Sequence, residues 1–243
     1  VTLTTTKDQF YIWNGSTASG VLQITDFQLE KKSYVTTYTE TSRGTTVATG
    51  GGWADVSGNS VNGTLTNGPT EDFTWPNCVV LDGSNDYVDF GNSPTSLSNL
   101  TISVWVKNTA SSSGGVVSKG LVNDANEWGI VFGYSNPLLV VGREKGNATQ
   151  LTYSWANYTS GFHHIVYTVQ PSVVANLYID GVRVTTGVPA SSIGSTSDSL
   201  QIGRHGTTYY LNGRVGEARI YDRFLSADEV LQLYDSSRGR YGR

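Results

Sequence analysis

Cysteine, methionine and long apolar runs are scarce or missing in this sequence of 243 residues. Its only cysteine, Cys78, cannot form a disulfide within the chain, so the fold does not depend on oxidation, and we expect a buried, inert thiol. The chain starts at Val1 and contains no methionine, so we expect Val1 to be a processed or trimmed end. No apolar run approaches the ~18 residues that a membrane-spanning helix requires, so we expect no membrane insertion.

Charge is also scarce. Charged residues make up 15% of the chain, and the formal net charge is −4. Basic residues are scattered, apart from Arg238, Arg240 and Arg243 near the end. The basic stripe typical of nucleic-acid-binding proteins is therefore missing, and we expect no nucleic-acid partner.

Proline is rare, with 6 residues, whereas glycine is abundant, with 28. Together with many Thr, Ser, Val and Tyr residues, this composition favours short strands joined by tight turns. Strand-like runs recur between residues 79 and 221, and the dipeptides Asp82-Gly83 and Asp180-Gly181 are hairpin signals. The spacing predicts an all-β sandwich or barrel.

One short helix is predicted near the end of the chain. Residues 215–222 alternate as a closing strand does. Ser226 and Glu229 then form the capping-box pattern that starts a helix. The apolar side of this helix is formed by Val230, Leu231 and Tyr234. We expect the helix to cover one edge of the sandwich.

The first 45 residues differ from the rest. Residues 10–13 and 21–24 are strand-like, and residues 28–38 resemble the closing run of the carbohydrate-binding-type jelly rolls of phage virion proteins. We interpret residues 1–45 as the remnant of a preceding jelly roll, or as an arm that pairs with the main sandwich or with another copy of the chain. A few strands alone are marginally stable, so such a segment needs a partner.

Two further parts complete the expected organisation. Residues 46–74 are rich in Gly, Asn, Ser and Thr and are expected to form a linker. Residues 75–243 carry six elements in order that resemble the laminin-G-like, concanavalin A-like jelly roll of phage tail-fibre and decoration proteins. These elements are residues 81–88, 102–107, 162–166, 177–181, 202–204 and 213–226 with the helix that follows. The resemblance implies an antiparallel jelly-roll β-sandwich with one short C-terminal helix.

Catalytic patterns are absent from the sequence. Endoglucanases of the concanavalin A-like fold use a Glu-x-Asp-x-Glu strand that points paired carboxylates into one cleft, and no such triplet occurs here. His163 and His164 are adjacent on a strand, so they point to opposite faces and are expected to be packed histidines. The Gly-x-Ser-x-Gly elbow is also missing. We therefore expect no catalytic residues and no enzymatic activity.

Calcium is the one cofactor that the sequence leaves open. Asp82, Asn85, Asp86 and Asp89 offer hard oxygen ligands within eight residues. Turn formation explains the same residues equally well, so no metal ligand is assigned.

Sugar binding requires aromatic platforms with planar polar groups beside them. The candidate ligand-binding residues are Trp155, Tyr158, Arg143, His205, Tyr209 and Tyr210. The segment 155–158 is the strongest loop candidate, and His205 is expected to be exposed in a Gly/Thr loop. The alternative, that each aromatic residue packs in the core or at an edge, stays open.

Three functions fit these features. The first is a non-catalytic virion surface protein, such as a phage tail fibre, appendage or capsid decoration, whose jelly roll binds a glycan or host surface. The second is a purely structural protein of a capsid layer or extracellular filament, with copies of itself or other virion proteins as partners. The third is an accessory carbohydrate-binding module of a secreted bacterial enzyme. All three place the protein on a virion surface or outside the cell.

Overall fold

The structure is a computed structural model, which describes residues 52–55, 57, 59–72, 76–109, 113–120, 125–133, 139–143, 150–158 and 160–243. The predicted strand segments at residues 10–40 lie outside these residues. None of the helices in the described part has the length and hydropathy needed to span a membrane.

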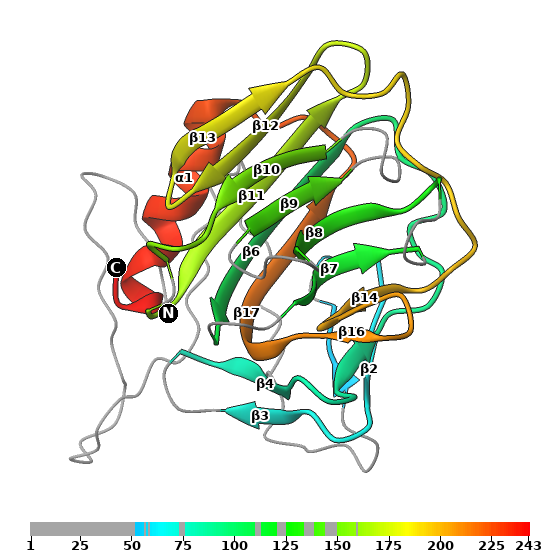
Figure 1. Cartoon of the computed structure of the whole chain (residues 1–243), viewed down its shortest axis with the longest axis vertical. Coiled ribbons are helices and arrows are strands. Elements are labelled where there is room, and N and C mark those ends of the chain that lie inside the picture. Colours follow the sequence, from blue (N-terminus) through cyan, green and yellow to red (C-terminus); the bar gives the residue numbers. More distant parts are fainter. Residues whose placement is uncertain are drawn as a thin grey trace, which may run out of the picture. The chain divides into compact units, whose positions relative to one another are not determined.

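Two large antiparallel sheets form the layers of a β-sandwich, as the sequence predicts (Figure 1). The eight-stranded sheet has the order β1 (Gly52–Trp53), β2 (Gly63–Thr66), β5 (Tyr87–Asp89), β14 (Leu200–Ile202), β7 (Gly114–Lys119), β8 (Trp128–Phe132), β9 (Leu139–Arg143) and β10 (Gln150–Ser154). The seven-stranded sheet has the order β13 (Val182–Gly187), β12 (Val174–Ile179), β11 (His163–Gln170), β6 (Leu100–Asn108), β17 (Asn212–Tyr221), β4 (Cys78–Asp82) and β3 (Thr70–Asp72). A small hairpin of β15 (Arg204–His205) and β16 (Tyr209–Tyr210) forms a separate two-stranded sheet.

The core lies between the sheets because alternate residues of each strand point inward. Trp128, Ile130 and Phe132 of β8 belong to the same buried cluster as Ile165 and Tyr167 of β11 in the other sheet. Their neighbours along each strand therefore point to the two outer faces of the sandwich.

The histidine pair follows this alternation, which confirms the expected opposite orientations. On the outer side of β11, the His164 ring stacks on Trp105, with 5.0 Å between centroids. On the inner side, His163 meets the edge of Trp155 at 5.5 Å. Both histidines are buried, as expected of packed side chains.

The C-terminal helix α1 (Ala227–Ser237) begins with the predicted capping box. The Ser226 hydroxyl accepts a hydrogen bond from the Glu229 backbone N–H, and the Glu229 carboxylate accepts one from the Ser226 backbone N–H. The apolar side differs in part from the prediction, because Val230 is buried whereas Leu231 is 46% exposed.

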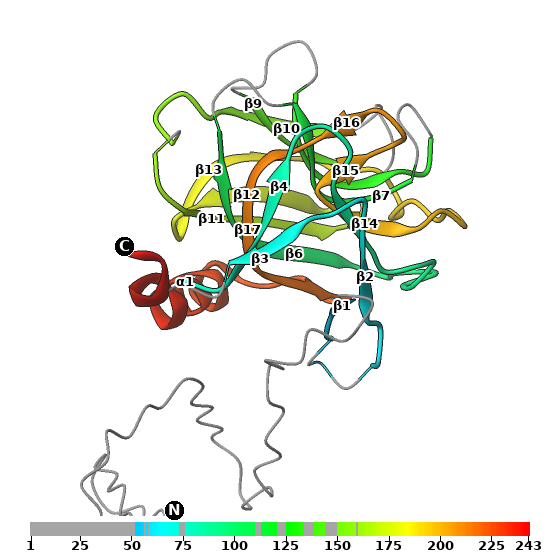
Figure 2. The same ribbon diagram turned by 90° about the horizontal axis from the view of Figure 1, so that it is seen from below.

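This helix covers the outer face of the seven-stranded sheet and not an edge of the sandwich, which corrects the sequence-based expectation (Figure 2). The reason is the large apolar side chains on the outer side of β6, β11 and β12. Trp105, Val166 and Tyr178 are almost fully buried there, and leaving them in water would be unfavourable.

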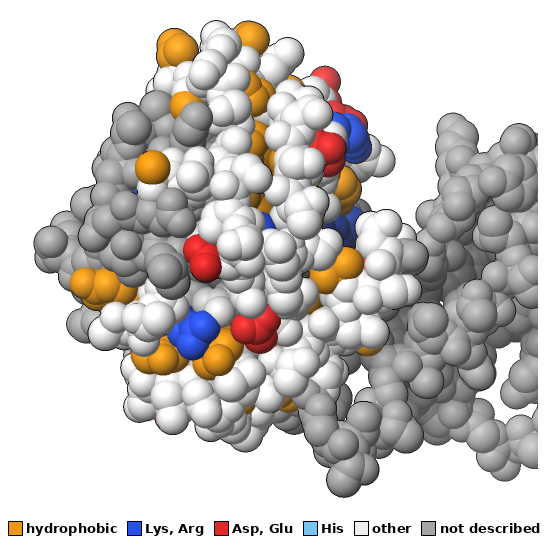
Figure 3. Space-filling model, turned by 90° about the vertical axis from the view of Figure 1, so that its right-hand side faces the viewer, with side chains coloured by type: hydrophobic (Ala, Val, Ile, Leu, Met, Phe, Trp, Pro, Cys, Tyr) orange, Lys and Arg blue, Asp and Glu red, His pale blue; other side chains and the backbone are white. Residues whose placement is uncertain are grey.

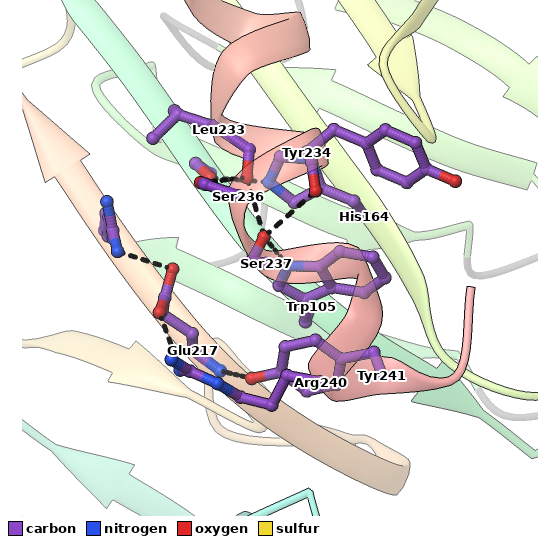
Figure 4. A network of polar contacts seen from close by, with 11 residues as sticks. Trp105, His164, Glu217, Leu233, Tyr234, Ser236, Ser237, Arg240 and Tyr241 are labelled. Carbon is purple, nitrogen blue, oxygen red and sulfur yellow. Dashed lines mark hydrogen bonds and ion pairs between the residues drawn. The ribbon is translucent and has the colours of Figure 1, made fainter. Parts of the chain in front are cut away.

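A network of polar contacts anchors the end of the helix and the following 3-10 turn η1 (Arg238–Tyr241) to the sheet (Figure 4). The Trp105 indole N–H donates to the Ser237 hydroxyl at 2.9 Å. The Glu217 backbone N–H donates to the Tyr241 hydroxyl at 2.7 Å, and Arg240 pairs with the Glu217 carboxylate at 3.2 Å. The C-terminal segment is thus joined to both β6 and β17.

The sandwich extends into residues that we expected to form a linker. Strand β2 pairs with β5, with Leu65 opposite Val88, and β3 pairs with β4, with Glu71 opposite Val79. Leu65 packs against the main core, which explains why this stretch joins the sheet despite its polar composition. The linker prediction for residues 46–74 is therefore wrong for the strands between residues 52 and 72.

The two hairpin signals had different outcomes. Asp180 and Gly181 connect the paired strands β12 and β13 with positive φ angles of 51° and 78°, which confirms a tight hairpin. Asp82-Gly83 instead ends β4, and the chain crosses to β5 in the other sheet. The Asp82 carboxylate accepts the Ser84 backbone N–H at 2.7 Å, so the same dipeptide makes a crossing turn here.

Cys78 is buried and free, as predicted. Its burial raises the pKa of the thiol, which disfavours the reactive thiolate. The thiol therefore behaves as a small apolar side chain of the cluster around Trp105.

Candidate functional site

The β15–β16 hairpin lies against the outer face of the eight-stranded sheet, on the side opposite α1. Gly115 of β7 lies opposite Val131 of β8. Val131 follows Ile130, which points into the core, so Val131 and Gly115 face the outer side of the sheet. A Cβ atom at Gly115 would lie 2.2 Å from the Arg204 carbonyl oxygen. Only glycine allows this approach, and the Ser118 hydroxyl, which donates to the same carbonyl at 2.5 Å, fixes it.

An aromatic and polar cluster surrounds the start of the hairpin, and we name it the Arg204 cluster: Tyr87, Asp89, Gln201, Arg204 and Tyr210. The Arg204 guanidinium carbon lies 3.7 Å from the centroid of the Tyr87 ring, and the Tyr87 and Tyr210 rings are 6.4 Å apart. Arg204 Nε donates to Gln201 Oε1 at 3.0 Å, and Gln201 Nε2 donates to Asp89 Oδ2 at 3.5 Å. The guanidinium is therefore held by a ring on one side and an amide at its inner end.

Neighbouring strands bring this cluster to the outer face. Tyr87 and Asp89 flank Val88, which is fully buried, and Gln201 lies between two core residues of β14. Tyr87, Asp89, Arg204, Tyr209 and Tyr210 are partly exposed. Figure 3 shows the side of the molecule that carries β2, β14 and β16, where charged side chains are few and acidic and basic groups lie close together in two areas.

A buried charged group lies on the same face, and we name it the Glu127 triad: Glu127, Arg143 and His205. Arg143 Nη1 donates to Glu127 Oε1, and His205 Nε2 lies 2.5 Å from Glu127 Oε2. The three residues are 1%, 5% and 1% exposed. Because Glu127 holds the imidazole in place, the expectation that His205 is exposed is wrong.

The remaining two candidates lie elsewhere. Trp155 is 0% exposed, and its ring packs 5.1 Å from Phe132 and 5.5 Å from His163. Tyr158 is partly exposed, with its ring 5.4 Å from that of Trp155. Because Trp155 is fully buried, its ring cannot contact a ligand, and it packs against the ring of Tyr158.

The structure thus divides the six sequence-predicted residues among three places. Tyr209 and Tyr210 lie on the hairpin, Arg143 and His205 lie in the triad, and Trp155 and Tyr158 lie near His163. Tyr87 and Gln201 were missed by the sequence-based reasoning. In the sequence, Tyr87 and Gln201 each lie next to an apolar strand residue, Val88 and Ile202, which predicts that they point away from the core. That they lie on one surface follows only from the pairing of β5 with β14.

The acidic residues considered for calcium serve as turn acceptors in the structure. Besides Asp82, Asp86 accepts the Asp82 backbone N–H at 3.2 Å, and Asp89 accepts the Gly91 backbone N–H at 2.8 Å. Backbone hydrogen bonding, from Ser84 above all, lowers the pKa of Asp82, whereas burial raises the pKa of Asp86. Among the described residues, no three His, Cys, Asp or Glu side chains are grouped as metal ligands, and calcium stays a prediction.

The two packed antiparallel sheets, with one face covered by a helix and the other by a short hairpin, define a jelly-roll type β-sandwich. The family model described as the concanavalin A-like lectin/glucanases superfamily matches residues 82–231, which is more than half of the chain. The protein therefore belongs to this superfamily. This confirms the resemblance to the concanavalin A-like jelly roll and the fold class that the sequence predicts. No curated protein matches the chain.

Several solved structures share the fold. The binding domain of Paraclostridial Mosquitocidal Protein 1 has a TM-score of 0.61 at 19% identity, with 75% of this chain and 49% of that chain covered. Domain 4 of AbnA, an extracellular arabinanase from Geobacillus stearothermophilus, in complex with arabinotriose, has a TM-score of 0.57 at 20% identity, with 74% and 92% covered. The CBM40 of the Ruminococcus gnavus IT-sialidase, bound to α2,3-sialyllactose, has a TM-score of 0.52 at 18% identity, with 64% and 95% covered. This chain spans about half the length of the toxin binding domain.

Proposed function

We propose that this protein is a non-catalytic glycan-binding protein of a virion surface or the extracellular space, and that the Arg204 cluster is its binding site. The observation that carries this proposal is the partly exposed pair of tyrosine rings, Tyr87 and Tyr210, beside the guanidinium of Arg204. Aromatic rings pack against the apolar faces of sugars, and planar polar groups bond sugar hydroxyls.

The comparisons support the ligand class. Two structures of the same fold, the arabinanase domain and the sialidase domain, were solved with bound saccharides. Fold kinship alone does not establish function, so the proposal depends on the local chemistry of the Arg204 cluster.

The Glu127 triad supports a non-catalytic role. Glycosidases need two carboxyl groups about 5 to 9.5 Å apart across the bond to be cleaved, one of them available as an acid or base. Both oxygens of Glu127 are engaged by Arg143 and His205, so this carboxylate is committed to a buried ionic contact. The triad supports the sheet next to the hairpin that carries Tyr209 and Tyr210.

The virion location rests on residues 28–38 and on the six jelly-roll elements between residues 81 and 226, which resemble segments of phage virion proteins. Copies of the chain or other virion proteins are then the expected assembly partners. Light scattering at several protein concentrations tests self-association: a monomer at all concentrations that binds sugar would contradict a purely structural role.

A second candidate function is an accessory carbohydrate-binding module of a secreted enzyme. It is favoured by the arabinanase domain, 92% of which is covered by this chain. Both candidates require sugar binding and differ in the surrounding protein, so the same binding experiment tests their common part.

That experiment is a glycan array followed by titration calorimetry of the best ligand. We expect Tyr87→Ala and Tyr210→Ala to weaken binding at least tenfold, and Arg183→Gln, an exposed arginine of β13 in the other sheet, to leave it unchanged. Absence of binding to every glycan, or equal affinity of all variants, would overturn the proposed site.

A further inference from the structure

We propose that the Arg204 cluster selects sugars that carry a carboxylate, which the terminal amino groups of Arg204 bind as a two-pronged donor. This inference rests on the proposed glycan-binding function and specifies its ligand class. It follows from how Arg204 is held and from which of its hydrogen-bond donors remain unused.

The stem and inner end of Arg204 are fixed, whereas its outer donors are not engaged. Tyr87 lies under the guanidinium, and Gln201 accepts the hydrogen bond from Nε. Among the described residues, Nη1 and Nη2 of Arg204 make no hydrogen bond and no ion pair. A planar fork held in this way has already lost much of its side-chain entropy, so a ligand that fits it binds at a lower entropic cost.

Most other arginines in the described part of the chain end in a carboxylate of the protein. The pairs are Arg143 with Glu127, Arg214 with Asp72, Arg219 and Arg240 with Glu217, Arg223 with Glu229, and Arg238 with Asp235. Arg204 differs from them. The Tyr87 ring and the Gln201 amide fix its position, and no carboxylate in the described part of the chain contacts its guanidinium.

The acidic groups nearby are committed to other partners. Asp89 accepts the Gly91 backbone N–H and the Gln201 amide, and Glu127 is engaged on both oxygens by Arg143 and His205. Neither carboxylate pairs with Arg204. Among the described residues, the Arg204 guanidinium therefore has no carboxylate in direct contact, and Asp89 is separated from it by the Gln201 amide.

A carboxylate fits this arrangement better than a neutral hydroxyl pair. Its two oxygens match the two parallel N–H donors of a guanidinium, and charge-assisted hydrogen bonds are roughly twice as strong as neutral ones. The sugar ring that carries the carboxylate would then lie over Tyr87 or Tyr210. Both uronic acids and sialic acids have this chemistry, and the experiment separates them.

The test compares matched ligands by titration calorimetry. The pairs are sialyllactose against lactose, and oligomers of uronic acids against the same oligomers after reduction of their carboxyl groups. We expect the acidic member of at least one pair to bind at least tenfold more tightly, with an affinity that falls as salt is added. The pair that shows this preference identifies the source of the carboxylate.

Three variants assign the preference to Arg204. Arg204→Gln removes the charge and is expected to abolish the difference within the pair. Arg204→Lys keeps the charge without the planar fork, so we expect it to restore only part of the preference. Arg183→Gln removes an exposed arginine of β13 and is expected to bind as the wild type does. Thermal unfolding of each variant verifies that it is folded.

The outcomes separate this inference from the proposed function. If the wild type binds the acidic and the neutral sugar of each pair equally, and Tyr87→Ala loses this binding, carboxylate selection is overturned and glycan binding at the site is retained. A preference that survives in Arg204→Gln would overturn the assignment to Arg204. Failure of every sugar to bind the wild type would overturn both.

Discussion

The ring of Tyr241 lies almost parallel to the indole of Trp105, with 4.3 Å between centroids and 13° between planes. Tyr241 belongs to the C-terminal turn and Trp105 to β6 near the middle of the chain, so this stack joins distant segments. Tyr241 is 6% exposed, and its hydroxyl accepts a hydrogen bond from the Glu217 backbone N–H. The C-terminal turn thereby covers the outer face of the seven-stranded sheet around Trp105.

Replacing this ring is expected to loosen the C-terminal helix. We predict that Tyr241→Ala lowers the free energy of unfolding by about 3 kcal/mol, because a large buried aromatic side chain is lost. Tyr241→Phe keeps the stack and loses one hydrogen bond, so we expect a loss of about 1 kcal/mol. Urea unfolding measures both, and equal stability of Tyr241→Ala and the wild type would contradict the anchoring role.

His164 makes stability depend on pH. Its burial under the helix lowers the pKa from the ordinary 6.5 to about 4. Between these pH values the unfolded chain binds the proton and the folded chain does not, so stability is full above pH 6.5 and falls as the pH drops towards 4. The expected loss from this residue is about 3 kcal/mol. Unfolding at several pH values, compared with His164→Gln, tests this; the same pH slope in both proteins would be the contrary result.

Gly115 permits the hairpin to approach the sheet, so a single methyl group at this position is expected to displace it. We predict that Gly115→Ala lowers stability by 1–3 kcal/mol, about the cost of overpacking, and weakens glycan binding. Gly239→Ala is the matched control, because a Cβ atom at Gly239 would meet nothing within 4 Å. Wild-type binding by Gly115→Ala would show that the hairpin position does not matter.

The Glu127 triad is expected to be structural. Glu127→Ala leaves Arg143 and His205 buried without their shared carboxylate, and breaking a buried ionic contact costs about 3–5 kcal/mol. Chemical denaturation measures this loss. Full stability combined with loss of a sugar-cleaving activity would instead point to a catalytic glutamate.

Much of the fold follows from local patterns in the sequence. The Asp180-Gly181 hairpin, the Ser226 capping box and the opposite orientations of His163 and His164 all depend on residues close together in the chain. The crossing at Asp82-Gly83 was not predictable in this way, because the same turn chemistry serves a hairpin and a passage between sheets.

The candidate site was harder to predict because it is assembled from distant strands. Tyr87 and Arg204 are separated by more than a hundred residues and meet only because β5 pairs with β14. Trp155 shows the converse: a tryptophan outside a clear strand pattern is a core residue, since Phe132 and His163 close around it. Trp155→Ala is therefore a poor test of binding, because about 3–5 kcal/mol of stability would be lost with the ring.

The most direct test of glycan binding at the Arg204 cluster is NMR spectroscopy of the protein titrated with its best glycan. We expect the Arg204 Nε–H signal and the ring signals of Tyr87 and Tyr210 to shift with saturating ligand, while the indole N–H signals of Trp105 and Trp155 stay in place. Shifts confined to Trp155 and Tyr158, or to residues of α1, with none at Arg204, would contradict this expectation.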